Sequence, residues 1–157
     1  MSQFAWVEMY EEIAAKLLDY ENRQGELISL IQDMLSQGLK PISPNDRDKD
    51  GNQVLLQEID PFTFFASFNR DITPKNRSEI LAYLKQTWDL KAEVPTAFEG
   101  IPTTNNQSSW FFPYVASRKQ EDIPNLWKLA WEAVTGEPEQ LDQKLFDTCL
   151  QIKYSGI

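Results

Sequence analysis

The sequence contains no histidine, one cysteine and only six widely separated glycines among its 157 residues. The absence of histidine excludes Ser-His and Cys-His nucleophile pairs, histidine general bases and most zinc sites. The scattered glycines form neither a phosphate-binding P-loop nor a GxGxxG turn. Carboxylates alone can do acid–base work, but nothing else in the sequence supports an enzyme, and we expect no cofactor.

The chain also lacks a long apolar run. No segment approaches the roughly 18 apolar residues that a membrane span needs. The N-terminus, MSQFAWVEMYEE, has neither the basic flank nor the apolar stretch of a signal peptide. The single Cys149 excludes an internal disulfide and fits a reducing compartment. We therefore expect a cytoplasmic protein without membrane contact, in which residues 1–157 form one domain.

The formal charge of −9 argues against a domain that simply coats nucleic acid. The charge is uneven, however. Residues 1–60 carry 12 acidic and 5 basic side chains, a net of −7, and residues 120–157 carry 7 acidic and 3 basic, a net of −4. Residues 61–119 carry 5 acidic and 7 basic side chains, a net of +2, and hold 11 of the 19 aromatic residues. We expect any anion that the protein binds to contact this middle block.

Helical periodicity dominates the rest of the pattern. Asp60-Pro61 and Thr73-Pro74 each combine an N-cap residue with a proline at the first helical position. The short link between the first two helices predicts an antiparallel helical hairpin. We expect helices at about 3–20, 23–37, 61–69, 74–89, 123–135 and 138–152.

The segments between these helices differ in kind. Residues 39–59 read as a loop with a short extended pair near Val54–Leu56. Four phenylalanines within residues 62–68 exceed what one helix stripe needs and predict the centre of the core. Periodicity is lost over residues 91–122, which predicts a long structured loop rich in polar and aromatic residues. The predicted fold is therefore mostly α, a compact multi-helix domain with that loop.

One motif resembles a calcium site. Asp46, Asp48 and Asp50, followed by Gly51, match the first half of an EF-hand loop, in which side-chain oxygens wrap a hard cation. The twelfth position, however, is Gln57 instead of a bidentate glutamate. A solvated acidic turn is the favoured reading of this motif.

The long loop contains the residue types of a base-reading pocket. Aromatic faces stack on an extruded base, and side-chain amides read its Watson–Crick edge. The alternative is that the aromatic residues pin the loop to the core while the amides bind loop backbone. The candidate base readers are Asn105, Asn106, Trp110, Phe111 and Tyr114, and the candidate phosphate contacts are Arg70, Lys75, Arg77, Arg118 and Lys119.

Four motifs carry a family resemblance: Trp6…Tyr10-Glu11-Glu12-Ile13-Ala14-x-Lys16-Leu17-Leu18-x-Tyr20, Asp60-Pro61-Phe62-Thr63-Phe64-Phe65-x-x-Phe68-Asn69-Arg70-x-Ile72-Thr73, Val94-Pro95-Thr96-x-Phe98-x-Gly100-Ile101-Pro102 and Asn105-Asn106-Gln107-x-Ser109-Trp110-Phe111-Phe112. They resemble the N-terminal region of McrB-like proteins, the AAA-type nucleotide-dependent subunits of modification-dependent restriction systems. The resemblance implies a region placed ahead of a motor domain, with DNA, often modified DNA, and a motor or nuclease subunit as partners. The chain itself has no GxxxxGK[ST], so we expect it to be the N-terminal portion of a longer or split protein.

These observations lead to one hypothesis and two alternatives. The hypothesis is a non-catalytic DNA-recognition module of a McrB-like restriction or defence system, which reads modified bases. The first alternative is a helical protein-interaction or assembly domain that binds no nucleic acid. The second is an acidic DNA mimic, which needs carboxylates spread along one face at phosphate-like spacing.

Overall fold

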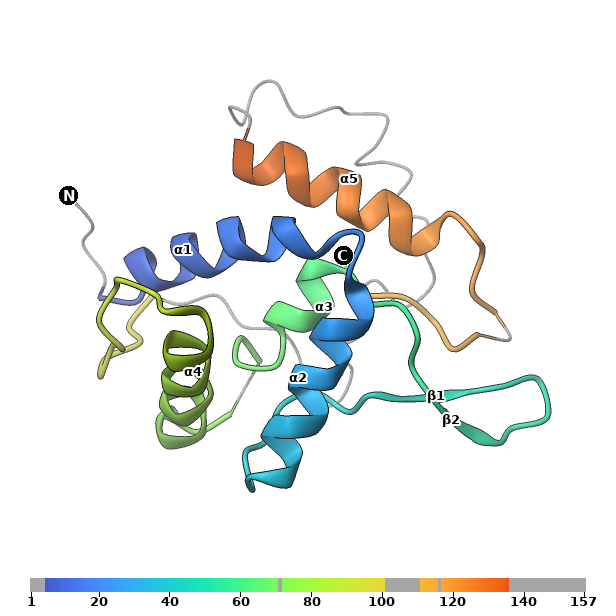
Figure 1. Cartoon of the computed structure of the whole chain (residues 1–157), viewed down its shortest axis with the longest axis horizontal. Helices are drawn as coiled ribbons and strands as arrows, with labels where there is room; N and C mark the ends of the chain where they lie inside the picture. Colours follow the sequence, from blue (N-terminus) through green and yellow to red (C-terminus); the bar gives the residue numbers. More distant parts are fainter. Residues whose placement is uncertain (1–4, 71, 101–110, 116, 136–157) are drawn as a thin grey trace.

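Five α-helices, one 3₁₀ helix and one two-stranded hairpin make up the part of the chain that the structure describes (Figure 1). The structure is a computed structural model, and it describes residues 5–70, 72–100, 111–115 and 117–135. About half of these residues are helical, which agrees with a mostly α domain. The elements are α1 (Val7–Leu17), η1 (Leu18–Tyr20), α2 (Gln24–Ser36), β1 (Asn45–Arg47), β2 (Gln53–Leu55), α3 (Pro61–Phe65), α4 (Pro74–Trp88) and α5 (Asp122–Thr135).

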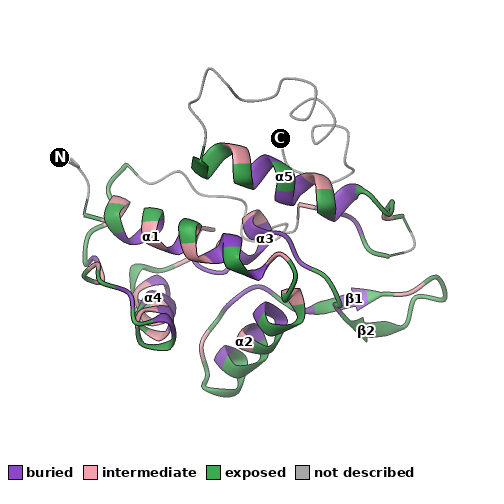
Figure 2. Ribbon diagram, turned by 45° about the horizontal axis from the view of Figure 1, so that its top comes forward, coloured by how far each residue is buried: buried purple, intermediate pink, exposed green. Residues whose placement is uncertain are grey.

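The first two predicted helices are present, but their predicted arrangement is wrong. α1 and η1 together replace the helix expected over 3–20, and α2 ends before Gly38, whose φ of 84° suits glycine at a helix stop. The two helices diverge in both ribbon views and do not lie antiparallel (Figures 1 and 2). The 3₁₀ turn η1 lies between the two helices, and α2 leaves it in a different direction from α1.

The helix starts predicted at Asp60-Pro61 and Thr73-Pro74 are both confirmed. The Asp60 carboxylate accepts hydrogen bonds from the backbone N–H groups of Phe62 (2.8 Å) and Thr63 (3.1 Å), and the Thr73 hydroxyl accepts one from Asn76 N–H (3.2 Å). α3 ends at Phe65, four residues before its predicted end. The turn that follows is closed by tighter bonds, including one from Phe68 N–H to the Phe65 carbonyl (3.2 Å), so the chain leaves the helix.

Because Asp60 is completely buried, its cap makes stability depend on pH. Burial raises the pKa of this carboxyl from 3.8 to about 6, while the bonds from Thr63 and Phe62 act in the opposite direction. The folded state therefore binds the proton more tightly than the unfolded state, and stability falls as pH rises through about 6. We expect the free energy of unfolding to be roughly 1–1.5 kcal/mol higher at about pH 5 than at about pH 7.5.

Urea unfolding at both pH values measures this difference. Asp60→Asn is the matched control, because asparagine still caps a helix but does not titrate in this range. The variant should lose most of the pH dependence. A wild type and a variant with the same pH profile would contradict the assignment of this effect to Asp60.

The phenylalanine-rich segment divides between core and surface groove. Phe64 and Phe68 are 0% exposed and lie at the centre of the core, as predicted. Phe62 and Phe65 are only partly buried and point toward a groove beside α5. Figure 2 shows the buried faces of the helices turned toward α3, which runs through the middle of the fold.

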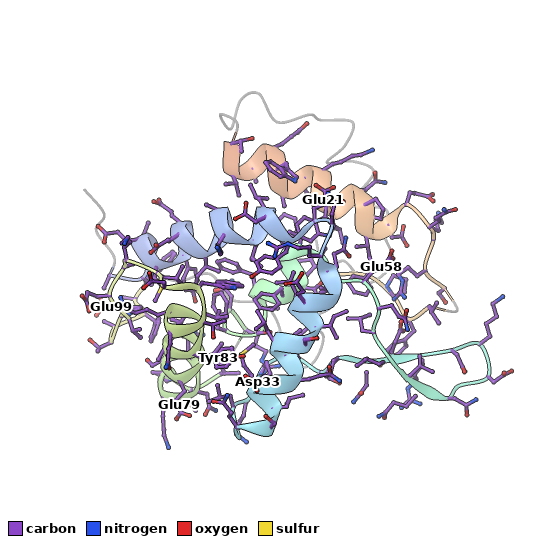
Figure 3. The ribbon with its side chains drawn as sticks, in the orientation of Figure 1. Glu21, Asp33, Glu58, Glu79, Tyr83 and Glu99 are labelled. Atoms are coloured by element: carbon purple, nitrogen blue, oxygen red, sulfur yellow. The ribbon has the colours of Figure 1, made fainter. Side chains whose placement is uncertain are left out.

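Side-chain hydrogen bonds connect elements that are far apart in the sequence. Trp127 Nε1 donates to the Ile59 carbonyl (3.0 Å), which fixes α5 over the start of α3. The Tyr83 hydroxyl donates to Asp33 Oδ2 (2.6 Å) and joins α4 to α2 (Figure 3). Burial and this carboxylate raise the pKa of Tyr83 to about 12. The core is thus closed by bonds between its helices as well as by apolar packing.

Residues 91–100 and 111–121, as far as they are described, contain no helix or strand and so agree with the predicted loop. Glu12 fixes the first of these stretches, since its carboxylate accepts bonds from the backbone N–H groups of Lys91 (2.8 Å) and Ala92 (2.9 Å). The same bonds lower the pKa of Glu12. Residues 101–110 and the helix predicted at 138–152 lie outside the described residues. Among the helices that are described, none has both the length and the apolar character to cross a membrane.

Candidate nucleic-acid interface

Two of the predicted phosphate contacts, Arg77 and Arg70, bind backbone inside the protein. The Arg77 side chain donates to the carbonyls of Phe68 (2.8 Å) and Arg70 (2.8 Å), and its guanidinium lies 4.9 Å from the Phe98 ring centroid. Arg77 is only 5% exposed, so we assign it to the fold and not to a DNA surface. Arg70 donates to the carbonyls of Lys40 and Pro41, which ties the loop before β1 to the end of the phenylalanine-rich segment.

Arg118 is also engaged internally. Its guanidinium forms an ion pair with Asp46 (2.8 Å), donates to the Pro113 carbonyl (3.1 Å) and lies over the Phe112 ring at 5.1 Å. The side chains of both ionic partners are almost fully buried. All three arginines of the net-positive block therefore organise loops, which leaves that block with less accessible positive charge than its composition predicts.

The remaining candidates are distributed over different parts of the surface. Lys75 is exposed at the start of α4 and lies 3.8 Å from Glu79, whereas Lys119 is exposed just before α5. Figure 1 shows these two regions at opposite ends of the molecule. Tyr114 is 48% exposed, while Phe111 is partly buried against Phe62 with 5.9 Å between ring centroids. The predicted base readers Asn105, Asn106 and Trp110 lie outside the described residues.

The aspartates of the EF-hand-like motif bind partners within the protein. Asp46 is buried and faces Arg118, while Asp48 accepts bonds from the backbone N–H groups of Asp50 (2.9 Å) and Asn52 (2.9 Å). These bonds lower the pKa of Asp48, and the bond from the Asn52 N–H group has the largest effect. The carboxylates thus shape a hairpin turn, and across the described ranges no group of three potential ligands could hold a metal ion.

That hairpin, β1–β2, agrees with the short extended pair expected near Val54–Leu56, but its exposed face was not predicted. Asn45 pairs with Leu55 and Arg47 pairs with Gln53 in the antiparallel register. Directly paired residues share a face, and side chains alternate along each strand, so these four lie on one face of the ribbon. All four are exposed, Leu55 by 44%. The ribbon projects from the helical body, and this face is not covered by the described residues (Figures 1 and 2).

The opposite face of the ribbon is anchored. Asp46 Oδ1 accepts bonds from the backbone N–H groups of Arg47 (2.8 Å) and Val115 (3.1 Å), and Asp46 Oδ2 pairs with Arg118. One buried carboxylate therefore fixes the ribbon to the segment that carries Tyr114. The Asp-Gly turn signal was visible in the sequence, but the partner of Asp46 lies 72 positions away, so its role was not.

The geometry defines a domain that, over its described residues, is about half helical and carries an anchored, projecting two-stranded ribbon. The chain belongs to the family described as domain of unknown function DUF8425, whose model matches residues 6–157. No curated protein matches the chain. No solved structure matches it either.

Proposed function

We propose that this chain is a non-catalytic DNA-recognition module of a McrB-like restriction system and that it reads DNA with the β1–β2 ribbon. The observation that supports the proposal best is the exposed ribbon face of Asn45, Arg47, Gln53 and Leu55. The McrB-like motifs supply the biological setting, with a motor or nuclease subunit as the second partner.

The ribbon face has the chemistry for reading base edges. The major groove of B-DNA admits a two-stranded ribbon, in which arginine pairs with guanine and asparagine or glutamine pairs with adenine. Arg47, Asn45 and Gln53 are these three residue types on one face, and Leu55 adds an apolar contact suited to a thymine or methylcytosine methyl group. The Arg47 side chain donates to the Gly51 carbonyl (3.1 Å), which holds it across the turn.

Phosphate contacts in this proposal are few. Lys49 is exposed at the tip of the ribbon, and Lys119 is exposed on the segment that Asp46 anchors beside it. Asp48 and Asp50 lie at the same tip, and the whole chain is acidic. Non-specific binding should therefore be weak, and affinity should depend on base contacts more than on charge.

The DNA prediction concerns the ribbon face. Arg47→Ala and Gln53→Ala should each weaken binding by about 1–3 kcal/mol, or roughly 5- to 150-fold in Kd, because each removes a bidentate base contact. Fluorescence polarisation with plain and methylated duplexes at about 50 mM salt measures this loss, and a concurrent melting curve confirms that the ribbon variants fold.

Arg23→Ala is the matched control for Arg47→Ala. Arg23 is an exposed arginine that precedes α2, so its replacement changes the net charge equally without touching the ribbon. It should bind DNA as the wild type does. If no duplex binds, or if Arg23→Ala and Arg47→Ala weaken binding equally, ribbon reading is refuted.

One observation favours the alternative of a protein-interaction or assembly domain. An apolar groove runs between α1, α3 and α5, and grooves of this kind bind amphipathic helices. This second function would be favoured if a partner subunit co-purifies with the chain and the chain binds no DNA. Replacing Ala133 in the groove wall with aspartate should then abolish the co-purification.

A further inference from the structure

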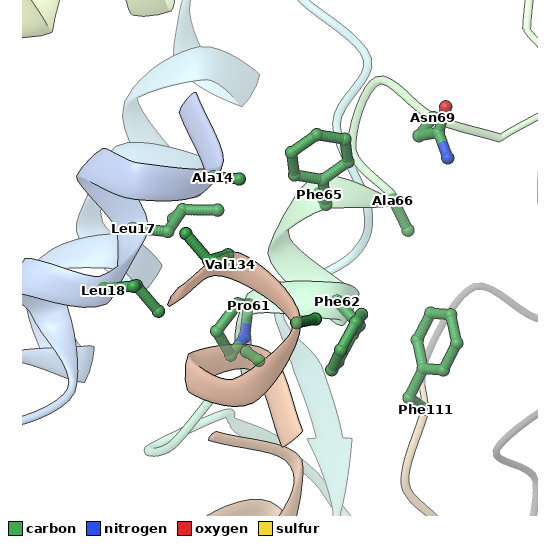
Figure 4. A pocket seen from close by; sticks show the side chains of 12 residues that line it. Ala14, Leu17, Leu18, Pro61, Phe62, Phe65, Ala66, Asn69, Phe111 and Val134 are labelled. Carbon is green, nitrogen blue, oxygen red and sulfur yellow. The ribbon is translucent and has the colours of Figure 1, made fainter. Parts of the chain in front are cut away.

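The groove between α1, α3 and α5 has a cavity of about 260 Å³ and an almost wholly apolar lining. α1 with η1, α3 with the residues that follow it, and the last turns of α5 all contribute side chains to this lining (Figure 4). Among the described residues that line the groove, Asn69 is the only one with a polar side chain. An apolar occupant therefore fits the groove without burying unsatisfied polar groups.

The small residues of the lining indicate that this occupant is a helix. Four of the described lining residues are alanines: Ala14, Ala66, Ala130 and Ala133. Small side chains on facing helices leave holes that accept large apolar side chains of another helix. The α5 side of the groove is open to solvent, since Ala133 is exposed and Val134 is 40% exposed.

A rigid aromatic side chain stands beside this open side. Trp131 lies one turn before Val134 on α5 and is 39% exposed. Its Nε1 donates to Glu21 Oε1 (2.8 Å), which fixes the indole before any partner binds. Tryptophan is enriched among the residues that dominate the binding energy of protein interfaces. The α5 side therefore offers an apolar contact surface that is already ordered.

An acidic stripe borders the groove on its α1 side. Within α1 and η1, which are described throughout, the exposed residues are Glu8, Glu11, Ala15 and Asp19, so three of the four are acidic and none is basic. Their spacing of three and four residues places them on one face of the helix. Glu11 lies three positions before Ala14, and Ala15 lies three positions before Leu18, so this face adjoins the lining.

We propose that the groove binds an amphipathic helix of a partner protein, whose apolar face is flanked on one side by lysine or arginine. The apolar face enters the alanine-lined groove, and the basic flank lies against the acidic stripe of α1. Charge selects this partner over a second copy of the chain, which has a net charge of −9 and would oppose the same acidic stripe. The inference rests on the protein-interaction alternative, whose partner it characterises, and is independent of DNA reading by the ribbon.

Two labelled synthetic peptides test the proposal on the full chain by fluorescence polarisation. Both are about 15 residues long and carry the same leucine stripe at helical spacing, but the flanking positions are lysine in one peptide and glutamate in the other. The lysine-flanked peptide should bind roughly 10-fold more tightly, because three exposed carboxylates each add a modest attraction. This preference should shrink between about 50 mM and about 300 mM salt, because salt screens exposed charges.

Two variants with matched controls locate the binding site. Ala133→Phe fills the groove and should weaken binding of the lysine-flanked peptide at least about 10-fold, whereas Ser29→Phe adds the same ring to an exposed position of α2 and should not. Glu11→Lys should weaken binding about 2- to 5-fold. Glu26→Lys makes the same change in net charge on α2 and should have little effect. Melting curves confirm folding, and the exposed Glu11 remains testable if Ala133→Phe does not fold.

Several results would overturn the proposal. They are no binding of the lysine-flanked peptide, equal binding of the glutamate-flanked peptide, or wild-type binding by a folded Ala133→Phe variant. A dimer in sedimentation that Ala133→Phe dissociates would identify a second copy as the occupant and would equally overturn it. If a partner subunit co-purifies although the lysine-flanked peptide does not bind, the basic helix is rejected and the interaction alternative stands. A DNA titration reports on the ribbon alone, so its failure is a separate result.

Discussion

Replacing Arg77 with methionine is expected to destabilise the domain by about 3 kcal/mol, although the change removes a charge from the core. The reason is that the buried Phe68 carbonyl would lose its donor, and an orphaned buried acceptor costs about 1–3 kcal/mol. The Arg70 carbonyl would also lose the guanidinium, although it would keep the bond from the Ile72 N–H group (2.8 Å). The stacking of the guanidinium on Phe98 would also be lost. Chemical denaturation of the purified variant measures the change.

Lys75→Met is the matched control on the same helix. Its side chain is 85% exposed, so the change should stay within about 0.5 kcal/mol. Arg77→Lys should fall between the two, because an ammonium cannot reach both carbonyls with the fork geometry of guanidinium. Equal stability of Arg77→Met and the wild type would show that Arg77 does not organise the turn between α3 and α4.

Asp46→Ala is the second large effect, with an expected loss of about 3–5 kcal/mol. The substitution leaves the Arg118 guanidinium buried without its ionic partner and removes the acceptor of the Val115 N–H group. In a double-mutant cycle with Arg118→Met, the two changes should be far from additive, with a coupling of about 2 kcal/mol. Urea denaturation of the wild type, the two single variants and the double variant gives every free energy of unfolding in the cycle.

The control for this cycle is an exposed pair. Arg23 and Glu26 form an ion pair at 3.4 Å with both side chains about half exposed, and Glu26→Ala should change stability by less than about 0.5 kcal/mol. Additive effects of the Asp46 and Arg118 substitutions would contradict a direct interaction between them. The variant also bears on function, because a ribbon that is no longer anchored should lose DNA affinity together with stability.

The local features of the fold could be predicted from the sequence because their causes are local. Asp60 and Thr73 act on N–H groups two or three residues away, and the apolar period of α1, α2, α4 and α5 is contained within each helix. The end of α3 was misplaced because tertiary packing of Phe64 and Phe68, and not helix propensity, decides where that segment turns.

The candidate site was harder to predict for the opposite reason. The charge of Arg70, Arg77 and Arg118 is visible in the sequence, but the direction of each side chain depends on carbonyls brought near by the fold. Asp46 looked like a cation ligand because its partner is distant in the chain. The ribbon face depends on register, which a three-residue strand does not specify by pattern alone.

The hydrogen bonds between distant residues also set the order in which the fold can form. Glu12 bonds residue 91 across 79 positions, and Trp131 Nε1 bonds Glu21 across 110 positions. Closing such long loops costs chain entropy before any contact compensates for it, which slows folding. During synthesis, α1 and α2 leave the ribosome long before α5 is available. Their apolar faces therefore stay uncovered until the second half of the chain has been synthesised. In a truncated nascent chain these faces would remain exposed, which favours chaperone binding or aggregation.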